Sequence, residues 1–424
     1  MEVFSRRRSL VGILALVVAL TAAACGDDKK DNAASSSTTA GGSTETTAAA
    51  GTPATGEPIV VGFTNLEGGA ISLPEVRLGA ETAVNYINKY GGVNNRPLKL
   101  IRCDVDGSPE KSVDCGNKFV QGKAVAALEG VDVGADAMLP ILKSAGIPLF
   151  GHVPFGPQQR AALGQAFFFG AAVPAYGAAE LQTAKDQGLT NAALFLADLP
   201  SSHAYESSVL PPTGQKLGVK VKVIYYDAAN PDWTTIVTTA LAGKPDTVGS
   251  PAAQESDCVG FIKAARAAGY TGNIFGAACS AFIPALGAGA VGVQTYSDLW
   301  NPTVTDVIPA AQKLDVKTYT DAMTASGNKD KIVGFAAGSF SDTMNFSKIL
   351  KGINGTIDGK SITAALQGTK NFSSFMGTNI TCDGTAWKGE TSCGTGVLIY
   401  EVTQGGARKL VSKGYLSLGQ FAPQ

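Results

Sequence analysis

The stretch Ile59-Val-Val-Gly-Phe63 is a short apolar run that predicts a buried β-strand. A helix should follow it, because apolar residues recur at helical spacing from Ala80 to Ile87. Ser72-Leu-Pro-Glu75 has the spacing of a capping box for the start of this helix, and Gly91-Gly92 is a typical end. Leu98-Lys-Leu-Ile101 predicts the next strand. A strand, a helix and a second strand in this order are typical of a parallel sheet.

The same alternation continues along the chain. A helix that begins at Ser108-Pro109-Glu110 precedes a strand at 124–128, a helix at 135–145 and a strand at 147–150. A second run of predicted elements comprises helices at 176–187, 205–217, 234–242 and 258–268 and strands at 192–196, 219–225, 247–249 and 274–276. Strict alternation predicts an α/β fold with parallel sheets and helices on both faces. The tail differs, because Asp-Gly and Gly-Gly turns within 377–387 and 396–409 predict hairpins.

The N-terminal residues have the pattern of an export signal. The basic cluster Arg6-Arg-Arg8 precedes the apolar run Leu10–Leu20, which is too short to span a bilayer, and the small residues Ala22-Ala-Ala24. Cys25 follows at once, in the position of the lipidated cysteine of a bacterial lipobox. We therefore predict a signal peptide at 1–24 and lipidation of Cys25; the alternative is an ordinary cleaved signal with an incidental cysteine.

A polar segment follows the predicted anchor. Residues 26–56 are rich in Ser, Thr, Ala and Gly and have almost no large apolar side chains, so 25–56 is predicted to be a disordered tether. The Ser/Thr richness is also compatible with glycosylation.

The cysteine count fits an exported chain. Lipidation of Cys25 removes one of seven cysteines and leaves an even number for disulfides. The six fall into local pairs, and we predict nearest-neighbour bonds because each pair brackets one turn between adjacent elements. The predicted disulfides are Cys103–Cys115, Cys258–Cys279 and Cys382–Cys393.

Charge and motifs argue against several functional classes. The formal net charge is −1, and removal of the three arginines and one glutamate of the signal leaves about −3, so there is no basic footprint for nucleic acid. No P-loop, Gly-x-Ser-x-Gly or His-Glu-x-x-His motif occurs, and His152 and His203 are the only histidines. We therefore predict a protein that is not an enzyme and has neither a cofactor nor a metal site.

The ordered set of short motifs resembles type I periplasmic binding proteins, and the nearest branch is similar to the leucine/isoleucine/valine-binding proteins of ABC importers. The motifs are Val60–Phe63, Gly79-Ala80, Ala83–Asn88, Gly91–Val93, Asn95–Ile101 with Asp104, Ser144–Pro148, Pro245-Asp246 and Ala264–Gly269. The resemblance implies two Rossmann-like lobes that are joined by three crossovers and close like a Venus flytrap. We place the crossovers near Val173-Pro174, Trp300–Pro302 and Phe375–Gly377. Lobe 1 is then 57–173 with 302–375, and lobe 2 is 174–301 with 376–424.

Ligands of open parallel sheets bind beyond the carboxyl ends of the strands. The loops at these ends are predicted at 65–72, 129–134 and 151–156 in lobe 1, and at 198–205, 250–254 and 277–281 in lobe 2. The candidate ligand-binding residues lie in these loops or at the second crossover: Asn65, Glu67, Ile71, Val131, Asp132, Val153, Phe155, His203, Tyr205, Ala252, Gln254, Ala278 and Trp300.

The sequence departs from the resemblance at the ligand. Amino-acid binders of the family hold the ligand carboxylate with Ser/Thr side chains and the ammonium with an acid. Here Val131-Asp132-Val133 and Phe155 occupy the Ser and Thr positions, and no acid lies near Ala278-Cys279. Candidate replacements for the acid are Glu67, Glu129, Asp132 and Glu255.

Several candidates also have a purely structural interpretation. Phe155 could be core, Trp300 could pack the hinge, and Asp132 could cap a helix. His203 could be a solvated loop residue.

We therefore expect a lipid-anchored receptor on the outer face of the cytoplasmic membrane that delivers a small, largely apolar solute to the permease of an ABC importer. The family default is a branched-chain amino acid, and the alternative is an aromatic or other hydrophobic carboxylate. We expect a monomer. Two other functions stay open: a ligand sensor for a membrane signalling partner, and a surface adhesion lipoprotein that has lost its site.

Overall fold

The computed structural model describes residues 51–69, 72–251, 254–332 and 334–422. The predicted signal peptide, Cys25 and most of the tether lie outside the described residues, as do the candidate ligand residues Ile71 and Ala252.

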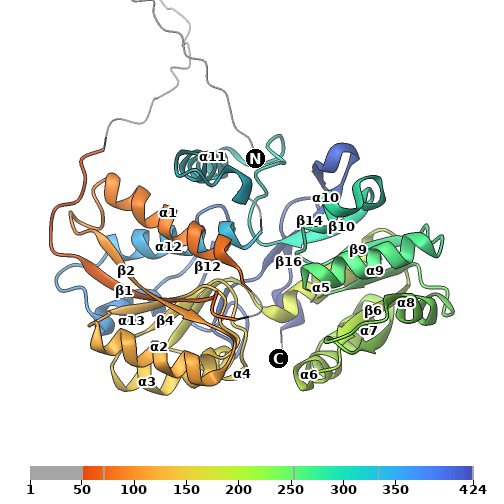
Figure 1. Ribbon diagram of the computed structural model, residues 1–424, viewed down its shortest axis with the longest axis horizontal. Helices are drawn as coiled ribbons and strands as arrows, with labels where there is room; N and C mark the ends of the chain where they lie inside the picture. The colour runs from red at the N-terminus through yellow and green to blue at the C-terminus, as the bar shows by residue number, and fades with distance from the viewer. Residues whose placement is uncertain (1–50, 70–71, 252–253, 333, 423–424) are drawn as a thin grey trace, which may run out of the picture. The chain divides into compact units, whose positions relative to one another are not determined.

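The first lobe is built on a parallel sheet of six strands (Figure 1). Its strand order is β13-β5-β4-β3-β1-β2, and every neighbouring pair is parallel. The strands are β1 (Ile59–Leu66), β2 (Leu98–Val105), β3 (Ala126–Glu129), β4 (Leu149–Gly151), β5 (Ala166–Ala171) and β13 (Ser392–Gly394). The associated helices are α1 (Pro74–Lys89), α2 (Pro109–Gln121), α3 (Leu139–Ser144), α4 (Pro157–Ala161), α11 (Ala310–Ala325), α12 (Phe335–Lys351) and α13 (Gly359–Gln367).

The second lobe has a sheet of eight strands with the order β15-β14-β10-β9-β8-β6-β7, and β16 pairs with β14. The strands are β6 (Asn191–Ala197), β7 (Lys220–Tyr226), β8 (Thr247–Ser250), β9 (Asn273–Gly276), β10 (Val293–Ser297), β14 (Gly396–Val402), β15 (Arg408–Leu410) and β16 (Leu416–Ser417). The helices are α5 (Val173–Asp186), α6 (Pro200–Ser208), α7 (Leu210–Leu217), α8 (Trp233–Leu241), α9 (Glu255–Ala267) and α10 (Phe282–Leu286). The predicted α/β fold of two parallel-sheet lobes is confirmed, and only β14 and its partners break the parallel pattern.

Short elements complete the chain. The 3₁₀ turns are η1 (Ala135–Ala137), η2 (Gly287–Ala290), η3 (Lys329–Lys331), η4 (Gln404–Gly406) and η5 (Gly419–Phe421), and a two-stranded sheet joins β11 (Phe372–Ser373) to β12 (Asn379–Ile380).

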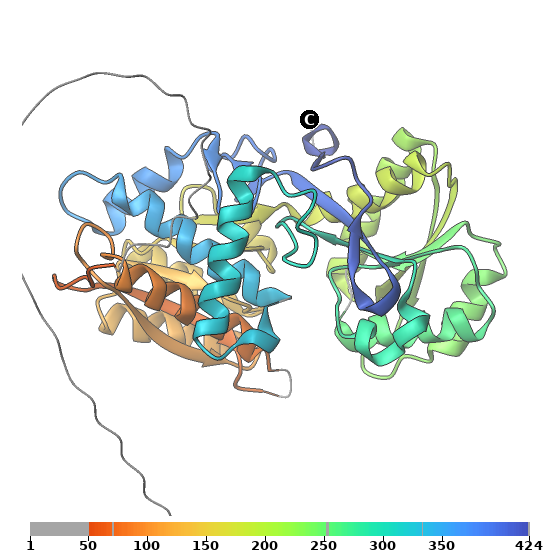
Figure 2. The ribbon, with the colours of Figure 1, turned by 90° about the horizontal axis from the view of Figure 1, so that it is seen from above.

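The chain crosses from the sheet of one lobe to the sheet of the other three times within the described residues (Figure 2). The first passage joins β5 to α5, and the second leaves β10 at Ser297. The third lies at Thr395, between β13 of the first sheet and β14 of the second. The sequence-based division had put the whole of 376–424 in lobe 2, whereas 392–394 pair with β5 of lobe 1. The pattern gave no hint of this parallel edge strand, because Ser392-Cys-Gly394 is not an apolar run.

Two local predictions were wrong. The capping box at Ser72 does not form: the N-cap of α1 is Leu73, without a side-chain cap. The hairpin predicted at 377–387 is absent, because the strand at Asn379 pairs backward with Phe372. By contrast, Ser108 caps α2 by accepting from the Lys111 amide, and β14 and β15 form the second predicted hairpin.

The core of lobe 1 is aromatic and aliphatic. Strand β5 carries Phe167-Phe-Phe169, with all three rings buried, and Phe150 stacks on Phe346 of α12 at 4.0 Å. Helices α1 and α12 pack closely because α1 carries Gly79 at the contact. A Cβ at this glycine would lie 2.2 Å from the Ala336 carbonyl oxygen, a distance that no side chain permits.

The three predicted disulfides are present: Cys103–Cys115, Cys258–Cys279 and Cys382–Cys393. The pair near the lobe 2 strand ends ties the first turn of α9 to the loop after β9. Cys279 is therefore a structural residue and is not a nucleophile.

Candidate functional site

The candidate residues at the lobe 1 strand ends are largely held by their own lobe. Asn65 is fully buried and donates from Nδ2 to Glu67 Oε1 at 2.9 Å and to the Leu73 carbonyl at 2.8 Å. Its Oδ1 accepts from the Val131 amide at 3.3 Å, and Val131 itself lies in the lobe 1 core. Asn65 therefore links two strand-end loops to the start of α1, and its side chain is used in doing so.

The four acids that could have paired with a ligand ammonium are mostly engaged. Glu67 forms ion pairs with Arg77 at 3.1 Å and Arg102 at 3.4 Å. Glu255 accepts from the Ser280 amide and, at 2.7 Å, from the Ala281 amide. Both carboxylates are therefore already paired, and a ligand ammonium would have to displace these partners.

Asp132 and Glu129 are buried within lobe 1. Asp132 Oδ1 accepts from the Ser112 hydroxyl at 2.7 Å and from the Gly134 amide at 3.0 Å. Glu129 accepts from the Gln159 side chain. Burial raises the pKa of both carboxyl groups, and their mutual repulsion raises that of Glu129 further. Both are at most 1% exposed, so neither carboxylate is open to solvent.

The candidate residues His203 and Tyr205 of lobe 2 differ in their exposure to solvent. His203 is half exposed, lies 2.7 Å from Asp198 Oδ1 through Nε2, and stacks on Tyr225 at 4.1 Å. Tyr205 packs on the lobe 2 core instead, and its hydroxyl oxygen would lie 2.1 Å from a Cβ built on Gly177 of α5. The ring of Tyr205 thus faces the interior of its lobe.

Two further candidates lie on the lobe 2 edge. Gln254 is the N-cap of α9 and is exposed, and Ala278 is exposed in the loop after β9. Neither carries a charge.

Apolar side chains are exposed at the strand ends of both lobes. Val133, in the loop after β3, is 55% exposed, and Phe155, after β4, is 39% exposed. Leu199, in the loop after β6 of lobe 2, is 48% exposed. These three side chains are the large exposed apolar residues in the loops that follow β3, β4 and β6. Val133 was noticed in the sequence only as a replacement for serine, and Leu199 was missed because it falls between polar loop residues.

Trp300 has the packing role that was its alternative interpretation. It is 3% exposed, its ring meets Tyr415 edge-on at 5.5 Å, and its amide donates to the Met376 carbonyl at 2.8 Å. These contacts join the second crossover to the segment that leads toward the third. Val153 likewise packs against the cluster beside the first crossover.

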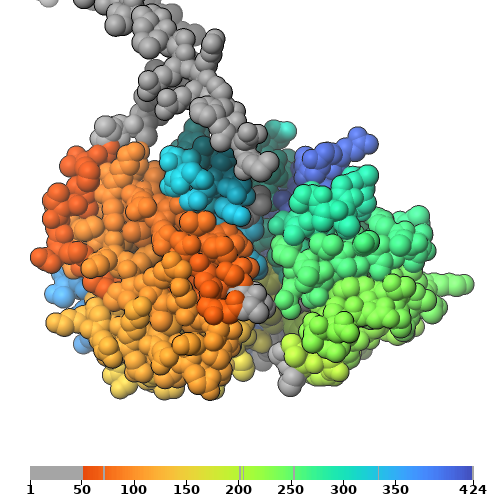
Figure 3. Space-filling view, viewed as in Figure 1, coloured from red at the N-terminus to blue at the C-terminus, as the bar shows by residue number. Residues whose placement is uncertain are grey.

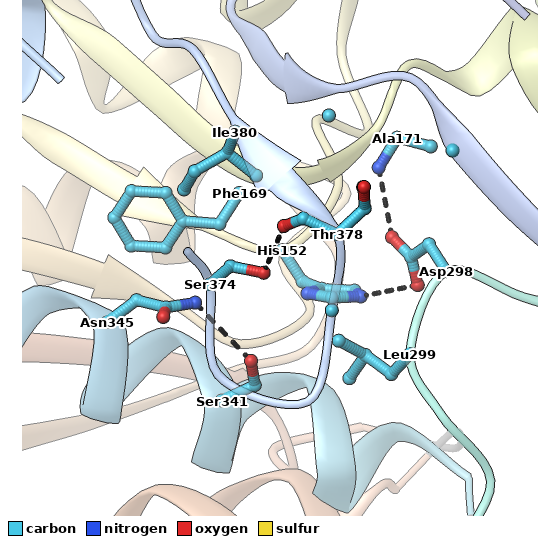
Figure 4. A pocket seen from close by; sticks show the side chains of 13 residues that line it. His152, Phe169, Ala171, Asp298, Leu299, Ser341, Asn345, Ser374, Thr378 and Ile380 are labelled. Atoms are coloured by element: carbon cyan, nitrogen blue, oxygen red, sulfur yellow. Dashed lines mark hydrogen bonds and ion pairs between the residues drawn. The ribbon is translucent and has the colours of Figure 1, made fainter. Parts of the chain in front are cut away.

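The crossovers enclose a polar cluster that the sequence analysis missed (Figure 4). His152, which follows β4, lies between two carboxylates: its Nε2 is 3.0 Å from Asp298 Oδ1 and its Nδ1 is 3.1 Å from Asp342 Oδ1. The other oxygen of Asp298 accepts from the Ala171 amide at 2.9 Å and the Tyr176 hydroxyl at 3.0 Å. The signal in the sequence was weak: one of only two histidines, placed directly after a strand.

The cavity beside this cluster is small. It has a volume of about 10 Å³, room for one water molecule. A larger cavity of about 230 Å³ lies on lobe 1 beside Leu163, Gln367 and Asp383. It is found where β5 begins, at the edge opposite the strand ends that carry the candidate residues.

Within the described part of the chain, no group of three or more His, Cys, Asp or Glu side chains is arranged to hold a metal ion. No helix among the residues described is long and apolar enough to cross a membrane.

The model of the periplasmic binding protein family matches residues 58–407, so the chain belongs to this family, whose members are extracytoplasmic solute receptors. The fold is similar to a leucine-binding protein from Thermotoga maritima, with 17% identity, a TM-score of 0.65, and 84% of this chain and 98% of that one covered. It is also similar to an ABC transporter substrate-binding protein from Aeropyrum pernix, with 17% identity, a TM-score of 0.71 and coverage of 86% and 99%.

A third similar structure is a fatty acid ABC transporter substrate-binding protein from Thermomonospora curvata, with 14% identity, a TM-score of 0.69 and coverage of 87% and 94%. At these identities the likeness shows the shared fold and leaves the ligand open. No curated protein sequence matches the chain.

Proposed function

We propose that this chain is the solute-binding component of an ABC importer and that its solute is small and largely apolar, without an ammonium group that needs an acid. The observation that carries the proposal is the contrast at the strand ends. Val133, Phe155 and Leu199 are exposed there, whereas Glu67 and Glu255 already have partners.

The energetics favour the same ligand class. Each 100 Å² of apolar surface that the solute and these side chains remove from water contributes about 2.5 kcal/mol. Burying an ammonium without a paired acid costs several kcal/mol, and freeing Glu67 for it would break the ion pairs of Glu67 with Arg77 and Arg102. A hydrophobic carboxylate avoids that cost, because free backbone amides at helix starts can donate hydrogen bonds to it. The start of α1, at the lobe 1 strand ends, has no side-chain cap.

The experiment is a thermal-shift screen of the purified protein against three groups of probes: leucine, isoleucine and valine; aromatic and aliphatic carboxylates; and the matching amides. A ligand at about 100 times its Kd adds about 2.7 kcal/mol of stability and raises the melting temperature. We expect carboxylates or amides to shift the melting temperature and the three amino acids to leave it unchanged. A shift with the amino acids alone would refute the ligand class.

A matched pair of variants locates the site. Phe155→Ser should weaken binding of the active probe roughly tenfold or more, since it removes an apolar contact of about 1.5–3 kcal/mol. Leu314→Ser is the control, because Leu314 is 68% exposed on α11 and does not lie at a strand end. Equal loss in the two variants would argue against a site at the strand ends.

We also propose that the chain acts as a monomer, anchored through lipidated Cys25 beside a membrane permease. The support is the sequence pattern of Arg6-Arg-Arg8, the short apolar run and Cys25. Cys25→Ala should release the protein into the medium, and deletion of the chain should abolish uptake of the solute found in the screen. Retention of the variant on the membrane would disprove the anchor, and unchanged uptake would favour a signalling role.

A further inference from the structure

The hinge cluster joins parts of the chain that must move relative to one another if the lobes close. His152 and Asp342 belong to lobe 1, since they follow β4 and lie on α12. Asp298 lies on the second crossover and accepts from the amide of Ala171, the last residue of β5 in lobe 1, and from the hydroxyl of Tyr176 on α5 in lobe 2. The imidazole ring therefore links Asp342 of lobe 1 to Asp298 of the second crossover, beside the direct bond from Ala171 to Asp298.

The geometry favours one protonation state of the ring when both carboxylates are ionised. Both ring nitrogens lie within 3.1 Å of a carboxylate oxygen, and an ionised carboxylate only accepts hydrogen bonds. A neutral imidazole has one N–H, so one of its two contacts would set a lone pair against a carboxylate. Only the doubly protonated ring donates to both.

The charges around the ring agree with this assignment. Burial by itself would lower the pKa of His152, but Asp298 and Asp342 raise it well above the ordinary value of 6.5. His152 in turn lowers the pKa of Asp298 against the effect of burial, whereas burial keeps the pKa of Asp342 above its ordinary range. The remaining titratable groups at the cluster are Tyr176, which donates to Asp298, and Tyr415, whose hydroxyl lies 3.2 Å from the Asp298 carbonyl oxygen.

We propose that His152 is a proton-operated latch of the hinge: its doubly protonated ring ties Asp342 of lobe 1 to Asp298 of the second crossover, and loss of the ring proton changes the resting distance between the lobes. Deprotonation removes one N–H and places a lone pair against a carboxylate, so one of the two links breaks. The cavity beside the ring leaves room for one water molecule to replace that link. The latch concerns the ligand-free protein and does not depend on the solute proposed above.

The first measurement is a ¹⁵N NMR titration of the histidine rings. The chain has only two histidines, so His203→Gln assigns the spectrum without disturbing the hinge. We expect both ring nitrogens of His152 to keep their protons as the pH rises past the ordinary histidine pKa of about 6.5. Asp342→Asn should lower the pH at which the ring loses its proton. A ring with a single N–H at about pH 7 would overturn the proposal.

The second measurement follows the lobes. Dyes attached at Lys143→Cys on α3 and Lys216→Cys on α7, both exposed, report the distance between lobes by energy transfer. We expect the transfer efficiency to change as pH rises through the transition seen by NMR, and His203→Gln to behave like the parent protein. His152→Gln should lack this step, which separates the latch from tyrosine and lysine titrations at alkaline pH.

The NMR titration and the energy-transfer measurement together test the latch. A titration of His152 with no accompanying change in transfer efficiency would show that the cluster is merely structural and would refute the latch. If His152→Gln does not fold, the parent protein and Asp342→Asn still give the test, because the change in lobe distance must shift to the same lower pH as the ring titration.

Discussion

The stability lost with the Cys258–Cys279 disulfide follows from the number of residues between the two cysteines. The two cysteines are 21 residues apart, and the chain-entropy relation for a loop of this length gives about 3.3 kcal/mol of stabilisation. Both residues are buried, at 0% and 3% exposure, so replacing them also removes packing. We therefore expect Cys258→Ala with Cys279→Ala to lower the free energy of unfolding by at least about 3 kcal/mol.

Urea unfolding followed by tryptophan fluorescence is a suitable assay, because Trp233 packs on the same lobe 2 core as Cys258. The matched control is Cys103→Ala with Cys115→Ala, whose separation of 12 residues gives about 2.8 kcal/mol. This loss should arise in lobe 1 and leave the Trp233 transition nearly unchanged. A loss below about 1 kcal/mol at Cys258–Cys279 would refute the chain-entropy reasoning for this lobe.

Three further predictions concern single side chains. Ser108→Ala should lower the free energy of unfolding by about 1 kcal/mol in urea, since it removes the cap of α2, whereas Ser72→Ala should change it by no more than a few tenths. Phe150→Ala should cost about 3–5 kcal/mol in the same assay, because the ring is 1% exposed and stacks on Phe346; a cost near zero would contradict the packing of α12 on the sheet. Glu180 is 1% exposed and neither of its carboxylate oxygens has a hydrogen-bond partner, so burial raises its pKa well above 4.5. The protonated form is then favoured in the folded state, and stability is lost as pH rises from about 4.5 through the folded pKa. Glu180→Gln should therefore raise the melting temperature at about pH 7.5 and not at about pH 4, because the amide stays neutral at both pH values; equal effects at both pH values would refute this cause.

The sequence predicted most of the fold because its elements follow local rules. Strand β1 and helix α1 are specified by an apolar run and by helical spacing, and both form where expected. The disulfides were predictable because each cysteine has its partner within about 20 residues along the chain. The start of α1 shows the limit, since Ser72 had the cap spacing and Leu73 took the position.

The candidate site was only partly predictable, because exposure and pairing are properties of the folded chain. Phe155 was proposed from its loop and is indeed exposed at a strand end. Tyr205 was predicted at the end of an equivalent loop, yet it lies in α6 and its ring packs against α5. Glu67 reads in the sequence as a free acid, and its arginine partners come from α1 and β2.

By itself, the sequence determined the order of strands and helices, the three local disulfides and the resemblance to a family of two-lobed receptors. Apolar periodicity, caps and short cysteine spacings act over a few residues, so they are visible before folding. Only the tertiary structure decided that β13 belongs to the first sheet and that His152 meets Asp298 and Asp342 at the hinge. These contacts join residues 146–224 positions apart, and no local pattern encodes a partner at that separation; the chain finds it because burying the sheets brings the crossovers together.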